Sequence, residues 1–323
     1  RLKDRQFEAV VESGVVAPFA TGGLDAAGTV FRILDVTDKP VSGRVELRGR
    51  GALTDVLGVL DQIPGINRDE DFSLTGLADG QAVFAGSLEF PLGRKPEPGE
   101  FRYDIAGTLT DVTSETLFPN HEIAASELLV AAENNGIVVK GPAVVDGVAL
   151  DAIWNSVPSL EGPATSALTG EIELSQNFVT QFGLGLPEGT VLGQGVGTLF
   201  LDLTNRASPG FELISDLSGV GFDLGFVGWR KPEDVKGDLF ASGTLGADTS
   251  IDVLEMSAPG LEASGSVRMN DDGSLDAVQF DRMRLGKWLN SAVRIQGNGE
   301  GQAADLYLSD GFVDAQELTE ATG

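Results

Sequence analysis

The feature that most constrains the fold is a series of short segments in which apolar and polar residues alternate. They are punctuated by glycines and recur from about residue 28 to residue 308; examples are 43–49, 101–107 and 168–174. Successive side chains of a β-strand point to opposite faces of a sheet. Each segment would therefore lay an apolar row on one face and a polar row on the other. We expect an all-β chain with one apolar sheet face and few short helices.

Turn signals separate these segments at a spacing of roughly 8–12 residues, which is typical of an antiparallel meander. Glycine preceded by Asn or Asp is the strongest short hairpin signal. The hairpin turns expected on this basis are Asp79–Gly80, Asn134–Asn135–Gly136, Asp146–Gly147, Asp271–Asp272–Gly273 and Asn298–Gly299. The segment 91–99 contains three prolines and is expected to be a loop, because proline cannot donate to a strand ladder.

Three short segments have helical character: 52–61, 175–184 with Ser175 as the N-cap, and 285–290. We expect these helices to lie across an edge or an open side of the sheet. A weak break near 159–164 would divide two lobes. No shift in composition makes the lobes independent, so we treat 1–323 as one elongated β-unit.

The charge balance excludes several partners. The chain of 323 residues has 49 Asp and Glu against 22 Lys and Arg, giving a formal net charge of −27. A surface this acidic repels nucleic-acid phosphates and anionic lipid headgroups. We therefore expect no nucleic-acid partner. An apolar fraction of 41% is enough to build a sizeable core.

Catalytic and metal-binding patterns are weak. The sequence has no cysteine and one histidine, His121, for which we expect a structural or solvent-exposed role. The calcium-loop resemblance of 268–279 fails, because Arg268 and Gln279 occupy positions that need carboxylates. Gly193–Gly197 lies inside a strand-like run rather than before a helix, so it does not indicate a nucleotide loop. We expect no cofactor, no metal and no enzymatic activity.

Two further groups have ordinary structural interpretations. Glu171 and Glu173 alternate on the polar side of an expected strand, where solvated charge is the default. Trp154, Trp229 and Trp288 are expected to anchor edges of the core.

The open question is what covers the apolar face. A single sheet of roughly 18–20 strands would extend about 85–95 Å and should split, close or curl. A second sheet, a closed barrel and a trough holding an apolar ligand all remain possible. The residues expected on the inner face are Val45, Leu47, Ala82, Phe84, Leu88, Phe90, Ile123, Ala125, Val220, Phe222, Leu224, Phe226, Leu261, Ala263, Val267 and Met269.

Several segments resemble the AsmA-like superfamily, in particular its large bacterial YhdP-type members with the DUF3971 region. They are 82–92, Asp111–Val112, 137–148 with Trp154, 217–220 with 228–232, and 308–315. The resemblance extends over roughly residues 20–318. It implies a long, strongly curved antiparallel sheet forming an elongated U-shaped groove, and it offers no catalytic motif.

The resemblance also implies a function. Such proteins are anchored in the inner membrane, project into the periplasm of Gram-negative bacteria, and are implicated in moving phospholipids toward the outer membrane. We thus expect a segment of a longer protein, without its anchor, that carries phospholipid or another acyl-chain lipid along a hydrophobic groove. The alternative is a structural or adhesive β-solenoid or sandwich whose apolar face is simply core.

Overall fold

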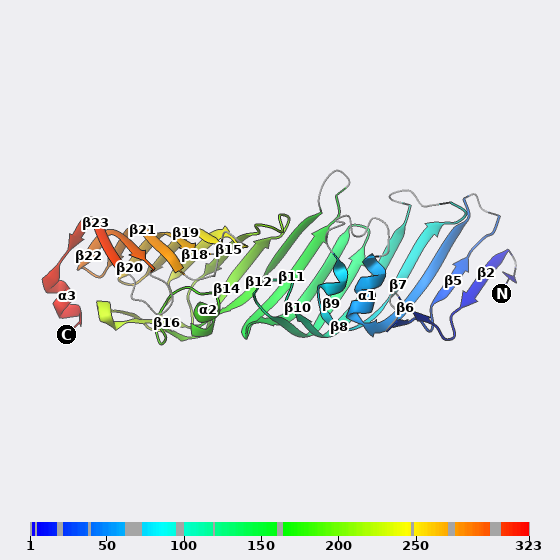
Figure 1. The fold of residues 1–323 in the computed structure, drawn as a ribbon, viewed down its shortest axis with the longest axis horizontal. Coiled ribbons are helices and arrows are strands. Elements are labelled where there is room, and N and C mark those ends of the chain that lie inside the picture. The colour runs from blue at the N-terminus through cyan, green and yellow to red at the C-terminus, as the bar shows by residue number, and fades with distance from the viewer. Residues whose placement is uncertain are drawn as a thin grey trace. The chain divides into compact units, whose positions relative to one another are not determined.

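The computed structural model describes residues 2–3, 5–17, 22–37, 40–61, 73–94, 100–118, 120–159, 164–246, 249–270, 275–297 and 305–322. The protein is mostly β with few short helices, and its strands form a long antiparallel sheet and a small three-stranded sheet (Figure 1). This confirms the expected all-β class with few short helices and a long antiparallel sheet. The chain divides into two compact units, which are described separately: unit 1 comprises 1–146 and 153–164, and unit 2 comprises 147–152 and 165–323. The break expected near 159–164 falls mostly outside the described residues and stays a prediction.

Unit 1 is built from consecutive antiparallel hairpins (Figure 1). Its elements are β1 (Leu2–Lys3), β2 (Gln6–Val10), β3 (Val15–Val16), β4 (Leu24–Asp25), β5 (Val30–Ile33), β6 (Ser42–Ala52), α1 (Leu53–Asp61), η1 (Leu74–Gly76), β7 (Asp79–Pro91), β8 (Arg102–Ser114), β9 (Ile123–Glu133) and β10 (Gly136–Val145). The next strand, β11 (Val148–Val157), contributes residues to both units.

Two of the expected hairpin turns are confirmed. Glu133 pairs with Gly136, so Asn134 and Asn135 form the two-residue turn between β9 and β10. Asp146 and Gly147, with φ of 49° and 79°, connect β10 to β11 in the left-handed conformation that such turns need. The turns expected at 271–273 and 298–299 lie outside the described residues, as do 95–99 of the expected loop.

The turn expected at Asp79–Gly80 is wrong, because both residues lie in β7. The pairing of β7 with β8 shifts register between Asp79 and Gln81, and β9 with β10 shifts between Lys140 and Val144. Gly80 has a φ of 140°, so it occupies a bulge rather than a turn. A dipeptide signal does not distinguish these two uses of a glycine.

Unit 2 continues the antiparallel pattern and adds a second layer. Its strands in the long sheet are β12 (Thr165–Leu174), β14 (Gly195–Asp202), β15 (Gly210–Ser215), β18 (Asp238–Thr244), β19 (Ser250–Ala258), β20 (Leu261–Met269), β21 (Leu275–Leu285), β22 (Leu289–Gln296) and β23 (Asp305–Val313). The other elements are α2 (Gln176–Gln181), η2 (Gly225–Val227), α3 (Ala315–Thr322) and the small sheet of β13 (Val191–Gly193), β16 (Val220–Leu224) and β17 (Trp229–Lys231).

The second layer buries the apolar side of the long sheet in unit 2. One cluster joins α2 and the small sheet to β12, β15 and β18, and comprises Val148, Ile172, Leu174, Val179, Val191, Leu213, Leu217, Val220 and Ala241. A second joins β17 to β20, β21 and β22, and comprises Trp229, Leu261, Ala263, Leu285, Trp288, Leu289 and Val293. Removing this much apolar surface from water is the main stabilising contribution in unit 2.

The helix expectations have mixed outcomes. The segment 52–61 forms α1, and 175–184 forms α2, whose N-cap Ser175 accepts a hydrogen bond from the Phe178 amide as expected. The helix expected over 285–290 is wrong, because Leu285 and Leu289 pair across a hairpin turn that contains Gly286 at a φ of 54°. Its apolar residues belong to the second cluster, and a glycine in the left-handed region ends one strand before the next begins.

The strong curvature expected of the sheet is not found, because it is neither closed nor strongly curled within either unit. In unit 2, the second layer supplies the burial that curling would otherwise provide. In unit 1, two glycines that would permit bending lie beneath phenylalanine rings, as described next.

Candidate functional site: the open face of unit 1

One side of the unit 1 sheet is apolar and is covered only in part; we call it the open face. Its rows follow from the strand register. One row runs from Phe31 through Val45 and Leu88 to Tyr103, and the next runs from Leu47 through Gly86 and Ile105 to Ala132. All the large side chains in these rows are half-buried. The open face is therefore a floor of aliphatic and aromatic groups.

Phenylalanine rings fill gaps that glycines leave in this floor. A Cβ added at Gly49 would lie 2.2 Å from Cζ of Phe84, and one at Gly43 would lie 2.8 Å from Cε2 of Phe31. Each ring thus lies over a glycine of β6, an arrangement that shields backbone and stiffens a glycine-containing strand. The space above these two glycines is therefore filled by the phenylalanine rings.

Helix α1 covers one end of the open face. Its Leu53 lies in a buried cluster with Ala82, Val112 and Ala125. Asp55 of the same helix is buried, and its carboxylate accepts a hydrogen bond of 2.8 Å from the Gly23 amide. The carboxylate is thereby partnered and ties α1 to the start of β4. The apolar rows beyond Phe84 extend past this covered end.

Aromatic side chains mark the opposite end of the open face. The rings of Phe90 and Phe101 are stacked with their centroids 6.0 Å apart, and Phe101 lies 6.1 Å from Tyr103. Burial raises the pKa of the Tyr103 hydroxyl above its ordinary value. Its ring thus lies among apolar neighbours, and the open face runs from α1 to an aromatic rim.

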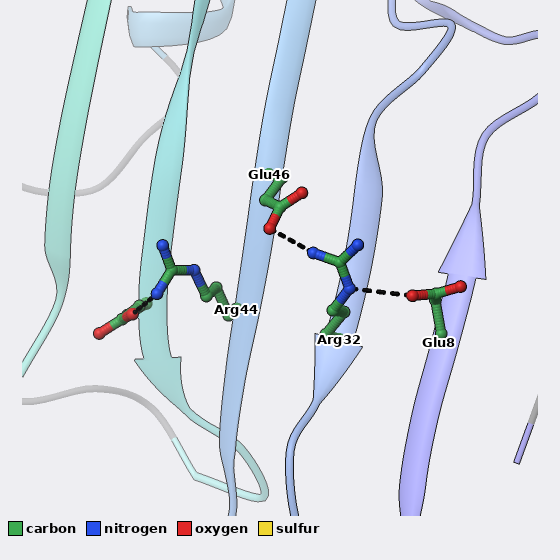
Figure 2. A network of polar contacts seen from close by, with 5 residues as sticks. Glu8, Arg32, Arg44 and Glu46 are labelled. Atoms are coloured by element: carbon green, nitrogen blue, oxygen red, sulfur yellow. Dashed lines mark hydrogen bonds and ion pairs between the residues drawn. The ribbon is translucent and has the colours of Figure 1, made fainter. Parts of the chain in front are cut away.

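The other side of the same strands is ionic near β2, β5 and β6. Arg32 Nε lies 2.9 Å from Oε2 of Glu8, and its Nη1 pairs with Glu46, while Arg44 Nη1 lies 2.9 Å from Oε1 of Glu89 (Figure 2). These pairs are partly exposed, so solvent screens them and each adds little to stability. These charged side chains favour contact with water, so they orient this part of the sheet toward solvent.

The predicted lining residues fall into three groups. Val45, Leu47, Leu88 and Phe90 lie on the open face. Ile123 is half-buried in β9. Ala82, Phe84 and Ala125 pack with α1. The residues of unit 2 lie elsewhere: Val220, Phe222 and Leu224 in the small sheet, and Leu261, Ala263, Val267 and Met269 in β20.

In unit 2 most of these residues pack against other parts of the chain. Val220, Leu261 and Ala263 are buried within the two clusters, and Phe222 and Leu224 pack against them. Val267 is also buried, Met269 is half-buried, and the Phe226 side chain lies outside the described residues. A lipid-lining role stays a prediction, and the open face is the part of this set that the protein's own second layer does not cover.

Sequence reasoning missed several members of the open face, among them Phe31, Tyr103, Ile105 and Ala132. The first three alternate with charged residues in the sequence, so the same periodic signal could have found them. It also missed the second layer, since β13, β16 and β17 are too short for a period-two pattern to identify their partners.

The polar groups considered for chemistry have structural surroundings. His121 stacks on Phe118 at 4.3 Å between ring centroids, and its Nδ1 lies 2.5 Å from Oδ2 of Asp146. Glu171 and Glu173 lie on β12, and Gly193 and Gly195 are strand residues. Among the described residues, no three His, Cys, Asp or Glu side chains cluster in a way that could hold a metal ion.

The three tryptophans have the expected placement in two cases. Trp229 and Trp288 are buried in the second cluster of unit 2, and the Trp229 indole N–H donates to the Pro259 carbonyl at 3.0 Å. Trp154 is half-buried in β11.

Comparison with known proteins gives no family for this chain: no family model, no curated protein and no solved structure matches it. Within the described residues, no helix combines the length and the apolar character that crossing a membrane requires.

Proposed function

We propose that this chain is a non-enzymatic lipid-binding segment and that the open face of unit 1 holds the acyl chains of a phospholipid or a similar lipid. The single observation that carries this role is an apolar floor that extends beyond α1 while the reverse side carries ion pairs. Such a sheet carries ion pairs on part of its reverse side and leaves its open face available to hydrocarbon.

The dimensions of the floor suit an acyl chain. From the Gly49–Phe84 pair to the Gly43–Phe90 pair there are six residues along the strands, a length of about 20 Å. Each chain methylene removed from water contributes about 0.8 kcal/mol, so long chains could be held without a specific polar contact. The groove would be shallow and elongated, with the open face as its floor and α1 at one end.

The wider setting follows from the resemblance to AsmA-like proteins. We propose a periplasmic location, an inner-membrane anchor elsewhere in the full protein, and movement of phospholipid between inner and outer membranes. The acidic composition is compatible with this role, because the contact with lipid would be made by hydrocarbon rather than by headgroup charge.

A paired substitution on β7 tests the lipid-binding role. Leu88→Glu and Gln81→Glu each add one carboxylate to the same strand, the first on the open face and the second on the reverse side. The purified protein and both variants would be loaded with phospholipid from mixed micelles and examined by native mass spectrometry. We expect bound phospholipid for the protein and for Gln81→Glu, and a loss of about tenfold or more for Leu88→Glu. Absence of phospholipid from the unsubstituted protein, or equal loss in both variants, contradicts the proposal.

A structural role is the second candidate, and unit 2 favours it. There the small sheet and helices fill the apolar side with the protein's own residues. A lipid carrying a photoreactive group in its acyl chain separates the two possibilities. Labelling confined to β6–β8 supports lipid binding by unit 1, whereas no labelling of either unit favours a scaffold.

A further inference from the structure

The reverse side of the unit 1 sheet carries an apolar surface of its own, which we call the outer band. Two cross-strand rows define it. One row contains Ala85, Ala106 and Ala131, and the other contains Val83, Thr108 and Leu129. These residues alternate with those of the open face, so they lie on the opposite side of the sheet. Val83 and Leu129 are 61% and 46% exposed, and the three alanines are exposed as well.

The ends of the outer band are positively charged. On β6, Arg48 pairs with Ala85 and Arg50 with Val83; on β10, Lys140 pairs with Leu129. Arg50 makes an ion pair with Asp25, whereas no ion pair of Arg48 or Lys140 occurs within the described parts of the chain. The chain has more than two carboxylates for each cation. Arg48 and Lys140 lie at opposite ends of the outer band, and among the described residues neither has a carboxylate partner.

The long sides of the outer band differ from its ends. On one side lies a row containing Glu46, Asp104 and Glu133; on the other lies a row containing Gln81 and Glu127. A partner with carboxylates along its whole length would be repelled by these rows. Charge complementarity therefore calls for acidic groups at the ends of a partner and basic groups along its flank.

The size of the outer band defines the shape of that partner. From β6 to β10 there are four strand spacings, or about 19 Å, and the two rows together are about 7 Å wide. An α-helix of about 13 residues has this length, and its apolar stripe is of comparable width. Small side chains in the alanine row allow close approach of a helix.

We propose that the outer band binds one amphipathic helix of a partner protein. The helix lies across the strands, with a carboxylate at each end about 12–13 residues apart, and with Lys or Arg on the flank that faces Glu46 and Glu133. The carboxylates pair with Arg48 and Lys140, and the apolar stripe covers Val83 and Leu129. The site is independent of the lipid-binding role, because it uses the other side of the sheet.

Two lactam-bridged helical peptides of about 15 residues test this site. Both carry the same leucine stripe and the same basic flank, and they differ only in having Glu or Lys at the two end positions. Binding would be measured by fluorescence anisotropy at physiological salt. We expect the Glu-ended peptide to bind more tightly by about threefold to fivefold for each ion pair. The double variant Arg48→Glu/Lys140→Glu should reverse this preference.

A matched pair of substitutions tests the apolar contact. Val83→Asp lies in the outer band, and Val253→Asp replaces an exposed valine of β19 in unit 2. Val83→Asp should weaken binding of the Glu-ended peptide about tenfold or more, and Val253→Asp should leave the affinity for this peptide unchanged. Circular dichroism checks that both variants retain the sheet.

Several results would overturn the proposed helix site. No binding of the Glu-ended peptide, equal affinity for both peptides, or equal loss in the two aspartate variants each does so. Binding of anionic phosphatidylglycerol vesicles that Val83→Asp abolishes, without any preference between peptides, would assign the band to a membrane surface. A dimer in light scattering that Val83→Asp dissociates would assign it to a second copy of this chain.

Discussion

The two units differ in how far the apolar side of their sheet is covered. Both contain antiparallel strands with an apolar side, but unit 2 covers that side with α2, α3 and the small sheet, whereas in unit 1 α1 covers one end. Leu217, Val220, Leu285 and Leu289 of unit 2 are at most 4% exposed, while the large side chains of the open face are half-buried. Enclosed apolar packing is therefore more extensive in unit 2, and the partly covered apolar floor lies in unit 1.

A buried lysine shows how tightly the second layer of unit 2 is held. Lys231 of β17 is 2% exposed, and its Nζ donates to the carbonyls of Leu217 at 2.8 Å and Val220 at 2.5 Å. Burial lowers the pKa of this ammonium, and Asp216 and Asp234 act in the opposite direction. The lysine thus partners carbonyls in the segment that leads into β16, where an unpaired carbonyl would be costly.

The largest expected effect compares two leucines. Leu285→Ala removes a side chain that is 1% exposed in unit 2, and should lower the free energy of unfolding by about 2–5 kcal/mol. Leu47→Ala on the open face should cost about 1 kcal/mol, because its neighbours do not enclose it. Urea unfolding followed by tryptophan fluorescence and circular dichroism measures both. Equal losses would mean that the two units do not differ in packing.

An intermediate effect concerns Lys231. Replacing it in Lys231→Met leaves the Leu217 and Val220 carbonyls without their donor, and should cost about 1–3 kcal/mol of unfolding free energy. The matched control is Arg230→Met, which removes an exposed cation from the adjacent position and should cost about 0–1 kcal/mol. If the two variants unfold at the same urea concentration, the second layer does not depend on this lysine.

The smallest effect is a pH dependence in unit 1. The Glu122 amide, and secondarily His121, hold the pKa of Asp146 below its ordinary value of 3.8. A carboxyl with a lowered pKa in the folded state stabilises that state above its unfolded pKa, and this contribution is lost as pH falls through the folded value. Amide hydrogen exchange at Glu122 should therefore accelerate, beyond its intrinsic rate, only below about pH 4.

The control for this pH dependence is Asp146→Asn, which cannot titrate. Exchange at Glu122 should be faster than in the unsubstituted protein at neutral pH and should then show no extra acceleration in acid. An unchanged acid response in this variant would assign the effect to another carboxyl.

Much of the fold could be predicted from the sequence, because period-two alternation is a local property of each strand. The long strands, the turns at 134–135 and 146–147, and the cap at Ser175 all depend on neighbouring residues alone. The errors have a common cause. Asp79–Gly80 and 285–290 contain ordinary local signals whose meaning depends on the strand paired beside them.

The candidate site was predicted only in part for a related reason. Alternation places Val45, Leu47 and Leu88 on one side of a sheet, and it places Leu261 and Ala263 on one side as well. Nothing local distinguishes these two groups, although the first lies on the open face and the second is buried in a cluster with Trp229 and Leu289. Sequence reasoning also treated the reverse side as uniformly polar, whereas Val83 and Leu129 are exposed there.

By itself the sequence determined that this protein is a two-sided antiparallel sheet with an acidic surface, because strand geometry and side-chain charge act over a few residues. Only the tertiary structure decided which apolar side is buried. That depends on short strands such as β13 and β17 returning over distant ones, and the burial they gain is set by contacts between residues far apart in the chain.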